Sequence, residues 1–446
     1  MGTRLSDSPM YAHLWGTPEL EQIFSEEARL QTWLDILVVL ARSQATLGII
    51  PAEAAEQIAG RARVPLLDLA FVAERTRTTG HSTLGLIQGL EQVLGERARE
   101  YVYFGATVQD LTDTWFGLVM RDVGAIVWRD LCAIETTLLD LAERHRDTVM
   151  AGRTHGQPGA PVTFGWKAAS WADELYRHRE RLRQGRPRWA VGQLAGAVGS
   201  LAFFGAAGPG LRASYCAALG LADPGISWLT ARDRVAEFGQ LLAAVCATLG
   251  RIGTEVYELQ RPEIGELREP VTGQGVGSIT MPHKRNPEIA EHLDTLARLA
   301  RSSTGVLLES MVGQHERDGR AWKAEWLALP EVCLLTGASL RFGRRLLDGL
   351  EVDAAAMQRN ARGLGSEQVL AGLAGQLGKH RAQRLLQQVL ASASPDELPA
   401  RLEGLGVAEA AQVRSWLDRD AVEVTRLMVD HVVSRGRASL AERPAW

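Results

Sequence analysis

The sequence predicts an all-α fold built around long helices. Ala, Leu, Glu, Arg and Gln dominate the 446 residues, and runs of β-branched residues are short. Three long segments show helical periodicity with few helix breakers, and they are residues 111–148, 235–260 and 289–312. Hydrophobic residues make up 46% and charged residues 23% of the chain, a balance typical of a globular protein with a large core.

The clearest helix is the segment 235–260. Its apolar residues are spaced alternately by four and three positions, and they are Phe238, Leu242, Val245, Leu249, Ile252, Val256 and Leu259. A spacing of 3.5 residues over about three heptads is typical of a left-handed, nearly parallel helical bundle. Such a seam packs against other long helices, either within one subunit or between subunits.

Clusters of Gly, Pro, Ser and Thr interrupt the helical pattern. They occur at residues 75–83, 102–110, 150–165, 192–210, 273–288 and 360–368. We place domain boundaries near residues 103 and 350. The expected parts are a helical N-terminal domain (1–103), a central domain of long bundled helices (104–350) and a helical C-terminal domain (351–446).

Charge and targeting signals exclude several classes of protein. The net charge is −4, which gives no electrostatic reason to expect a nucleic-acid or membrane partner. The N-terminus has no apolar signal-peptide region, and no stretch approaches 18 uninterrupted apolar residues. The arginine-rich stretch "RHRERLRQGRPR" (177–188) is either an anion site or, as we prefer, a solvated helix face.

The four cysteines are Cys132, Cys216, Cys246 and Cys333, which lie far apart in apolar contexts. Neither a CxxC pair nor a Cys/His ligand spacing is present, so we expect no metal site. Free, buried thiols are typical of a reducing compartment, and we therefore expect a cytoplasmic protein.

The stretch "GQGVGSITMPHKRNPEIAEH" (273–292) has an unusual composition for this helical chain. Its glycines permit backbone conformations that are closed to other residues. Pro287 suits the first turn of a helix that has Asn286 as its N-cap. The helix amides and Lys284 would then favour an anion and stabilise the alkoxide of Ser278. The alternative is a surface loop that only caps a helix.

The segment "GSITMPHKRNP" (277–287) resembles the signature GSSxMPxKxNP of the aspartase/fumarase superfamily, whose members eliminate across a succinyl unit and generally release fumarate. The resemblance extends from about residue 10 to about residue 440. It implies that Ser278 is the catalytic base and that Met281, Lys284 and Asn286 contact the substrate. Ile279 replaces the second serine of the signature.

Two further segments resemble conserved regions of this superfamily. "GATVQDLTDT" (105–114) resembles the region whose TSxD core contacts a substrate carboxylate, although a valine replaces its serine. This resemblance implies substrate contacts for Thr107, Gln109 and Asp110. "GRTHGQPGAPVTFG" (152–165) resembles the second region, and it implies the Thr154–His155 pair, whose histidine assists departure of the leaving group. The alternative for this histidine is a structural role.

Segments beside these regions bear on the substrate. "TTGHST" (78–83) resembles the part of adenylosuccinate lyases that brings another histidine into the site, which implies a catalytic His81 with Ser82 beside it. "HERDGRAWKAEW" (315–326) resembles the HERxxGxWHAEW pattern of 3-carboxy-cis,cis-muconate cycloisomerases rather than the phosphate-binding group of adenylosuccinate lyases. Arg317 is its candidate for substrate binding. The aromatic pair Trp322 and Trp326 lines a pocket or, as we prefer, belongs to the core.

The resemblance implies a lyase that acts on a small, non-nucleotide succinate derivative. Ser278 would remove a proton beside a carboxylate, and an amine or nitrite would leave from the resulting aci-carboxylate to give fumarate. This scheme needs no cofactor and no metal. The alternatives are lactonisation of 3-carboxymuconate, adenylosuccinate cleavage, and a non-catalytic descendant similar in kind to the lens crystallins derived from argininosuccinate lyase.

The resemblance also implies an assembly. Members of this superfamily have three all-α domains, and the long helices of four subunits form one core bundle. Each active site combines segments from three subunits. We therefore expect a homotetramer with composite active sites that bind a small dicarboxylate.

Overall fold

The computed structural model describes residues 4–271, 280–281 and 283–442, and it has the all-α architecture that the sequence predicts. The helices of the N-terminal and central parts are α1 (Pro18–Phe24), α2 (Glu26–Thr46), α3 (Ala52–Arg61), α4 (Leu69–Thr79), α5 (Leu84–Gln92), α6 (Glu96–Arg99), α7 (Val108–Arg144), α8 (Phe164–Trp189), α9 (Gly208–Ala218), α10 (Asp233–Gln260), α11 (Glu288–Glu309) and α12 (Gly319–Asp348). The C-terminal part adds α13 (Ala354–Asn360), α14 (Ser366–Leu377), α15 (Lys379–Leu390), α16 (Leu398–Gly404), α17 (Ala410–Leu417) and α18 (Glu423–Ala441).

Four short strands form two antiparallel pairs at the edge of this helical fold. β1 (Val149–Thr154) pairs with β2 (Gln157–Thr163), and β3 (Leu267–Arg268) pairs with β4 (Glu351–Val352). The first pair is a hairpin in the segment 150–165, which the sequence marked only as an interruption.

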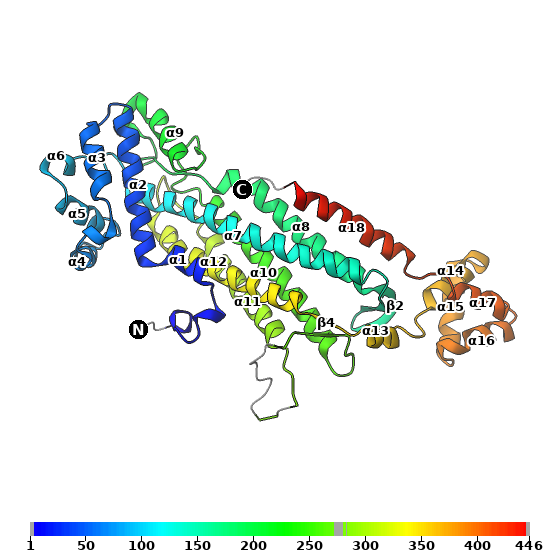
Figure 1. Ribbon diagram of the computed structural model, residues 1–446. Helices are drawn as coiled ribbons and strands as arrows, with labels where there is room; N and C mark the ends of the chain where they lie inside the picture. The colour runs from blue at the N-terminus through cyan, green and yellow to red at the C-terminus, as the bar shows by residue number, and fades with distance from the viewer. Residues whose placement is uncertain (1–3, 272–279, 282, 443–446) are drawn as a thin grey trace.

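The centre of the molecule is an elongated bundle in which α7, α8, α10, α11 and α12 run side by side (Figure 1). The predicted helices 111–148, 235–260 and 289–312 correspond to α7, α10 and α11, with ends that differ by a few residues. The N-terminal helices α2 to α6 gather at the end of the bundle where α7 begins (Figure 1).

The apolar seam of α10 is buried by helices of its own chain. Its seven residues are each at most 2% exposed, and α10 packs against α8, α11 and α12. Added Cβ atoms at Gly250 and Gly253 would lie 3.3 Å and 3.0 Å from the carbonyl oxygens of Leu293 and Ala290, so glycine permits the close approach of α11. The seam is therefore core within one subunit and not a surface for a second subunit.

Helix α10 also has the length and hydropathy of a membrane span, but 72% of its most apolar window is buried inside the fold. This burial is that of a core helix, because a lipid-facing helix would expose its apolar side chains.

The C-terminal part divides between two places. Helices α14 to α17 surround a small core of their own at the far end of the bundle (Figure 1), which includes Val369, Leu373, Leu402 and Trp416. Helix α18 returns along α7 and α8, where Arg146 binds Asp430 in a bidentate pair with both N–O distances at 2.6 Å. The segment 351–446 thus contributes both a peripheral cluster and one helix of the main bundle.

The arginine-rich stretch 177–188 lies on α8, and its side chains pair with carboxylates of the protein. The clearest pair joins Arg179 to Glu135 at 2.9 Å, with both side chains 1% exposed. Arg188 pairs with Glu237 on α10. Arg179 is therefore buried and paired, whereas Arg177, Arg183 and Arg188 stay exposed in their ion pairs, as in the solvated helix face that we preferred.

Candidate active site

The first turn of α7 is fixed by Thr107 and Asp110. They form a reciprocal capping box, in which the Thr107 hydroxyl accepts the N–H of Asp110 and the Asp110 carboxylate accepts the N–H of Thr107 at 2.9 Å. The carboxylate also accepts the N–H groups of Ala195 at 2.8 Å and Gly196 at 3.1 Å. Burial raises the pKa of Asp110 to about 7, against these donors, which favour its ionised form. Asp110 therefore ties the start of α7 to the segment that crosses it.

A cation reaches the same turn from the loop that precedes α12. Arg317 Nη1 donates a hydrogen bond of 2.7 Å to Thr107 Oγ1, and the Arg317 residue is only partly buried. A guanidinium beside a threonine hydroxyl is suited to binding a carboxylate.

Tyr103 completes this turn, and sequence reasoning missed it. Its backbone has a φ of +58°, an uncommon conformation for a residue other than glycine. Its buried hydroxyl lies near the hydroxyls of Thr83 and Thr107 but makes no well-formed hydrogen bond to a described residue. Burial and then the Asp110 charge raise the pKa of Tyr103, whereas the Arg317 charge lowers it. The phenol is therefore a neutral donor beside a cation, and its unmet hydrogen bond costs about 1–3 kcal/mol until an acceptor arrives.

His81 and Ser82 lie in the turn between α4 and α5, close to Tyr103. The N–H of Leu84 donates to His81 Nδ1 at 3.1 Å, which places the proton of the neutral imidazole on the exposed Nε2. The next residue, Thr83, is fully buried, and its hydroxyl lacks a partner. Through Thr83, which lies beside Tyr103, this turn adjoins the Thr107–Arg317 pair.

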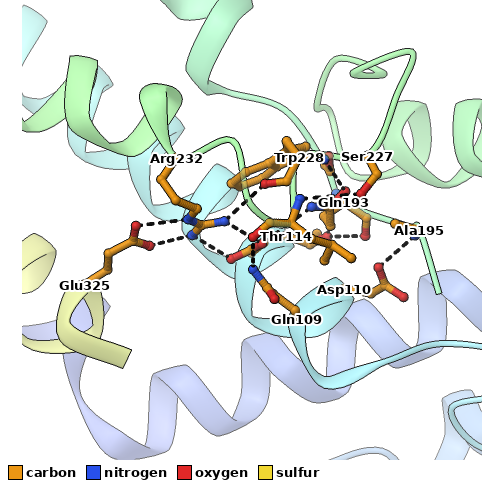
Figure 2. Close-up of polar contacts among 12 residues, drawn as sticks. Gln109, Asp110, Thr114, Gln193, Ala195, Ser227, Trp228, Arg232 and Glu325 are labelled. Atoms are coloured by element: carbon orange, nitrogen blue, oxygen red, sulfur yellow. Dashed lines mark hydrogen bonds and ion pairs between the residues drawn. The ribbon is translucent and has the colours of Figure 1, made fainter. Parts of the chain in front are cut away.

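Gln109 and a buried ion triad support the turn from below (Figure 2). Gln109 is fully buried and donates to the carbonyl of Leu229 at 2.6 Å, while its Oε1 has no partner. One turn further along α7, Asp113 binds Arg232 at 2.9 and 3.0 Å, and Arg232 binds Glu325 of α12 at 3.0 Å (Figure 2). This triad holds α7, α10 and α12 in register around the site.

Thr154 and His155 lie at the tip of the β1–β2 hairpin. His155 and Gly156 form its two-residue turn with φ values of +53° and +74°, the positive pair that a type I′ turn requires. Both Thr154 and His155 are exposed. Arg153 fixes the base of the tip through hydrogen bonds of 2.6 and 2.9 Å to Glu266, whose side chain is fully buried.

The N-terminus of α11 differs from the prediction. Its N-cap is Pro287 rather than Asn286, and neither supplies a side-chain cap. Instead, the carboxylate of Glu269 accepts the N–H groups of Ile289 at 3.2 Å and Ala290 at 3.1 Å. The expected cap was wrong because a carboxylate distant in sequence reaches these amides first. They are therefore already occupied and do not form an open anion site.

Lys284 is exposed in the segment before α11, Asn286 is partly buried, and Met281 is 43% exposed. The proposed base, Ser278, lies outside the described residues, as do Ile279 and the glycines of its loop. Glu266 and Glu269, which flank β3, anchor the base of the hairpin tip and the start of α11, respectively.

The start of α7 and the β1–β2 hairpin lie at opposite ends of the bundle, and the chain before α11 projects from the side of the bundle (Figure 1). Helix α7 begins at Val108, directly after Thr107, and runs for 37 residues toward the hairpin, a length of about 55 Å. One chain therefore does not bring Thr154 and His155 to the Thr107–Arg317 turn.

Among the residues that the structure describes, no group of three or more His, Cys, Asp or Glu side chains is placed to hold a metal ion. The four cysteines are free, and only Cys132 is partly exposed.

Comparisons with known proteins agree with this architecture. A family model described as "Lyase" matches residues 15–300. The N-acetyl-S-(2-succino)cysteine lyase of Enterococcus italicus is 38% identical over 97% of this chain and 96% of its own length. The 3-carboxy-cis,cis-muconate cycloisomerase of Pseudomonas aeruginosa is 38% identical over 96% of this chain and 94% of its own.

A solved structure has the same fold along nearly its whole length. The 3-carboxy-cis,cis-muconate lactonizing enzyme from Pseudomonas putida superposes with a TM-score of 0.86, at 34% identity, over 97% of this chain and 99% of that one. Fold and sequence together define an enzyme of the fumarate lyase, or aspartase/fumarase, superfamily, as the signature at 277–287 predicts. Within that superfamily the chain belongs to the lyase family whose model it matches.

Proposed function

We propose that this enzyme splits a carbon–sulfur bond in an S-succinylated thiol and releases fumarate and the free thiol. The observation that carries the proposal is the turn at the start of α7, where Arg317 and Thr107 lie 2.7 Å apart beside the unpaired hydroxyl of Tyr103. These groups suit one carboxylate of a succinyl unit. The nearly full-length similarity to an N-acetyl-S-(2-succino)cysteine lyase supports sulfur as the leaving atom.

The proposed reaction begins with proton removal from the carbon beside a carboxylate. Ser278 accepts this proton, and the electrons move into the carboxylate to give a doubly charged aci-carboxylate. Lys284 and Asn286 stabilise the new charge, because a cation and a donor placed in advance need no reorganisation during the reaction. The electron pair then forms the double bond of fumarate while the carbon–sulfur bond breaks.

A thiolate leaving group makes modest demands on acid catalysis. An amine leaves only after it is protonated, whereas a cysteine thiol has a pKa of about 8.5 and departs readily as the anion. His155 or His81 then delivers the proton that gives the free thiol. We therefore favour a thiolate over the amine or nitrite that the sequence alone led us to expect.

We further propose that the active site is assembled in a homotetramer. The support is the position of the candidate residues, since the Thr107–Arg317 turn and the β1–β2 hairpin that carries Thr154 and His155 lie at opposite ends of the bundle (Figure 1). Antiparallel association of long bundles would place the end of one subunit beside the opposite end of another.

Fumarate production from N-acetyl-S-(2-succino)cysteine tests the proposal. The wild-type enzyme should release fumarate and N-acetylcysteine in equal amounts, measured by ultraviolet absorbance and by thiol titration. Ser278→Ala should abolish release with an unchanged thermal midpoint, whereas Ser434→Ala, at an exposed position on α18, should behave as wild type. Fumarate formation by Ser278→Ala at the wild-type rate would show that the base is assigned wrongly.

Cycloisomerisation is the second candidate, because a cycloisomerase and a lactonizing enzyme are similar to this chain over nearly its whole length. This reaction closes a lactone and releases no fumarate. Parallel assays with 3-carboxymuconate, adenylosuccinate, argininosuccinate, aspartate and nitrosuccinate separate it from the lyase reactions by product. Turnover of 3-carboxymuconate alone would replace our proposal with this one.

A further inference from the structure

A pocket of about 410 Å³ lies between the N-terminal helices and the start of the bundle. Its volume is within the range of small-molecule sites. The lining residues come from α2, α4, α5, α7 and α12 and from the turn at Ser82, and its apolar wall consists of Leu30, Leu69, Val72 and Leu86.

Three indole rings give the pocket a rigid wall. Trp33 of α2 and Trp115 of α7 meet edge to face with ring centroids 6.1 Å apart, and Trp326 of α12 completes the wall. Trp326 packs edge to face on Trp322 at 4.9 Å. Of the aromatic pair in the segment 315–326, Trp326 therefore lines a pocket and Trp322 is core.

The wall carries polar hydrogens that no described residue accepts. The indole Nε1 atoms of Trp33 and Trp326 and the hydroxyl of Thr112 are all buried without a partner, and Trp33 is only 6% exposed. Unmet donors of this kind are costly to bury, so a ligand that brings acceptors gains affinity there once the buried ring edges turn toward the pocket.

The rim of the pocket is charged. Arg29 of α2 lies 5.8 Å from the Trp33 ring centroid, and its guanidinium is 3.7 Å from Glu26, which is largely exposed. Such a long, solvated ion pair contributes little, so Arg29 remains available to a carboxylate.

The pocket adjoins the proposed carboxylate site. Ser82 lines it and stands between His81 and Thr83, and Thr83 lies beside Tyr103. Thr112 lies on α7 little more than one turn after Thr107. The substituent of a succinyl unit held at Thr107 and Arg317 would therefore reach this pocket along Ser82 and Thr112.

We infer that this pocket binds the leaving group and selects an N-acylated amino-acid thiol, an inference that rests on the proposed function. The acyl carbonyl accepts the indole N–H groups of Trp33 and Trp326, and the acyl carbon chain lies on the aliphatic wall. The carboxylate of the amino acid pairs with Arg29. A free amine would bring only donors to the indole N–H groups and would leave them unpaired.

A comparison of two substrates tests this selection. The wild-type enzyme should have a kcat/KM about tenfold or more higher for N-acetyl-S-(2-succino)cysteine than for S-(2-succino)cysteine. Trp326→Phe and Trp33→Phe keep the ring and remove the N–H, and each should reduce this ratio by about three- to tenfold through KM. Trp15→Phe is the matched control, because its Nε1 is also buried without a partner and it does not line the pocket.

The proposed pairing of Arg29 with the amino-acid carboxylate is tested separately, with a substrate whose thiol part lacks this carboxylate. Arg29→Gln should raise KM for N-acetyl-S-(2-succino)cysteine by about threefold or more and leave KM for the corresponding N-acetylcysteamine adduct unchanged. Arg42→Gln, which removes an exposed ion pair elsewhere on α2, should change neither.

The possible outcomes distinguish a failure of the pocket assignment from a failure of the proposed lyase reaction. Fumarate release with an unchanged substrate ratio in both tryptophan variants would overturn the pocket assignment and leave the lyase intact. Absence of fumarate from both substrates would refute the lyase. The pocket is then judged by calorimetry with N-acetylcysteine alone: binding that Trp326→Phe weakens supports it, and no binding to the wild type overturns it.

Discussion

Tyr103 illustrates how a single residue prepares the proposed carboxylate site. Its left-handed backbone and its buried, unpaired hydroxyl are both unfavourable without a ligand. A substrate carboxylate that accepts a hydrogen bond from this hydroxyl would offset the second cost, and it would also meet Arg317. Tyr103 therefore combines a strained backbone with an unpaired hydroxyl donor at the place where the substrate carboxylate, which is an acceptor, is proposed to bind.

Removal of the Tyr103 hydroxyl should weaken substrate binding. The hydroxyl is proposed to hold a carboxylate that does not react, so its loss should affect the ground state and the transition state equally. Tyr103→Phe should raise KM by about three- to tenfold with little change in kcat, measured by initial rates of fumarate release. Tyr101→Phe, in the same segment, is the control. A fall in kcat at constant KM would contradict this role.

The roles of some single residues could not be predicted from the sequence. The motif at 277–287 named Lys284 and Asn286, but the cap of α11 comes from Glu269, which no local pattern connects to that helix. Tyr103 was missed for a related reason. Its letter in "VYFGATVQD" reveals neither a positive φ nor an unpaired hydroxyl, because both depend on residues from other elements.

At the scale of elements, His178 connects α8 to α10. Its Nε2 lies 2.8 Å from Thr248 Oγ1, and the residue is 4% exposed. Burial lowers the pKa of His178 from 6.5 to about 4, with a further contribution from Arg181. The folded protein therefore holds this imidazole neutral at pH values where the unfolded chain protonates it.

This depressed pKa predicts a loss of stability in acid. Between pH 6.5 and about 4 the unfolded chain binds more protons at this site, so the free energy of unfolding falls as the pH falls through that window. The contribution lost is about 3 kcal/mol. Urea unfolding at pH 7 and pH 4.5 should show a smaller difference in His178→Gln than in the exposed control His431→Gln. Equal changes in the free energy of unfolding between the two pH values in the two variants would contradict this role of His178.

The Asp113–Arg232–Glu325 triad predicts a larger effect at pH 7. All three side chains are at most 2% exposed, so the loss of the cation would leave two buried carboxylates facing each other. Arg232→Met should lower the free energy of unfolding by about 3–5 kcal/mol, whereas Arg42→Met at an exposed pair should lower it by less than about 1 kcal/mol. Chemical denaturation measures both, and similar values for the two variants would refute the structural role of the triad.

The helices could be predicted well from the sequence, but the helices that pack against each of them could not. The four-and-three spacing in α10 identified every buried seam residue, because a helix shows its apolar face in its own sequence. The same spacing is silent about which helices cover that face. The His155–Gly156 turn was also missed, since it lacks the Asn-Gly or Asp-Gly pair that usually signals a two-residue hairpin.

At the scale of the whole molecule, the bundle separates the proposed catalytic groups by its length. The resemblance to known enzymes predicted the all-α fold, whereas the return of α18 to the bundle carried no signal in the sequence. The site shared between subunits stays a prediction. A homotetramer predicts a mass in solution of four times 48.6 kDa by light scattering. A stable monomer that still released fumarate would show that one chain completes the site.

The most direct test co-expresses two inactive variants that lack different groups of the proposed site. Ser278→Ala removes the proposed base, and Arg317→Gln removes the cation at the start of α7. If each active site takes these residues from different subunits, random mixing should restore about a quarter of the wild-type rate of fumarate release from N-acetyl-S-(2-succino)cysteine. Mixed tetramers that form but remain as inactive as either variant alone would contradict the account.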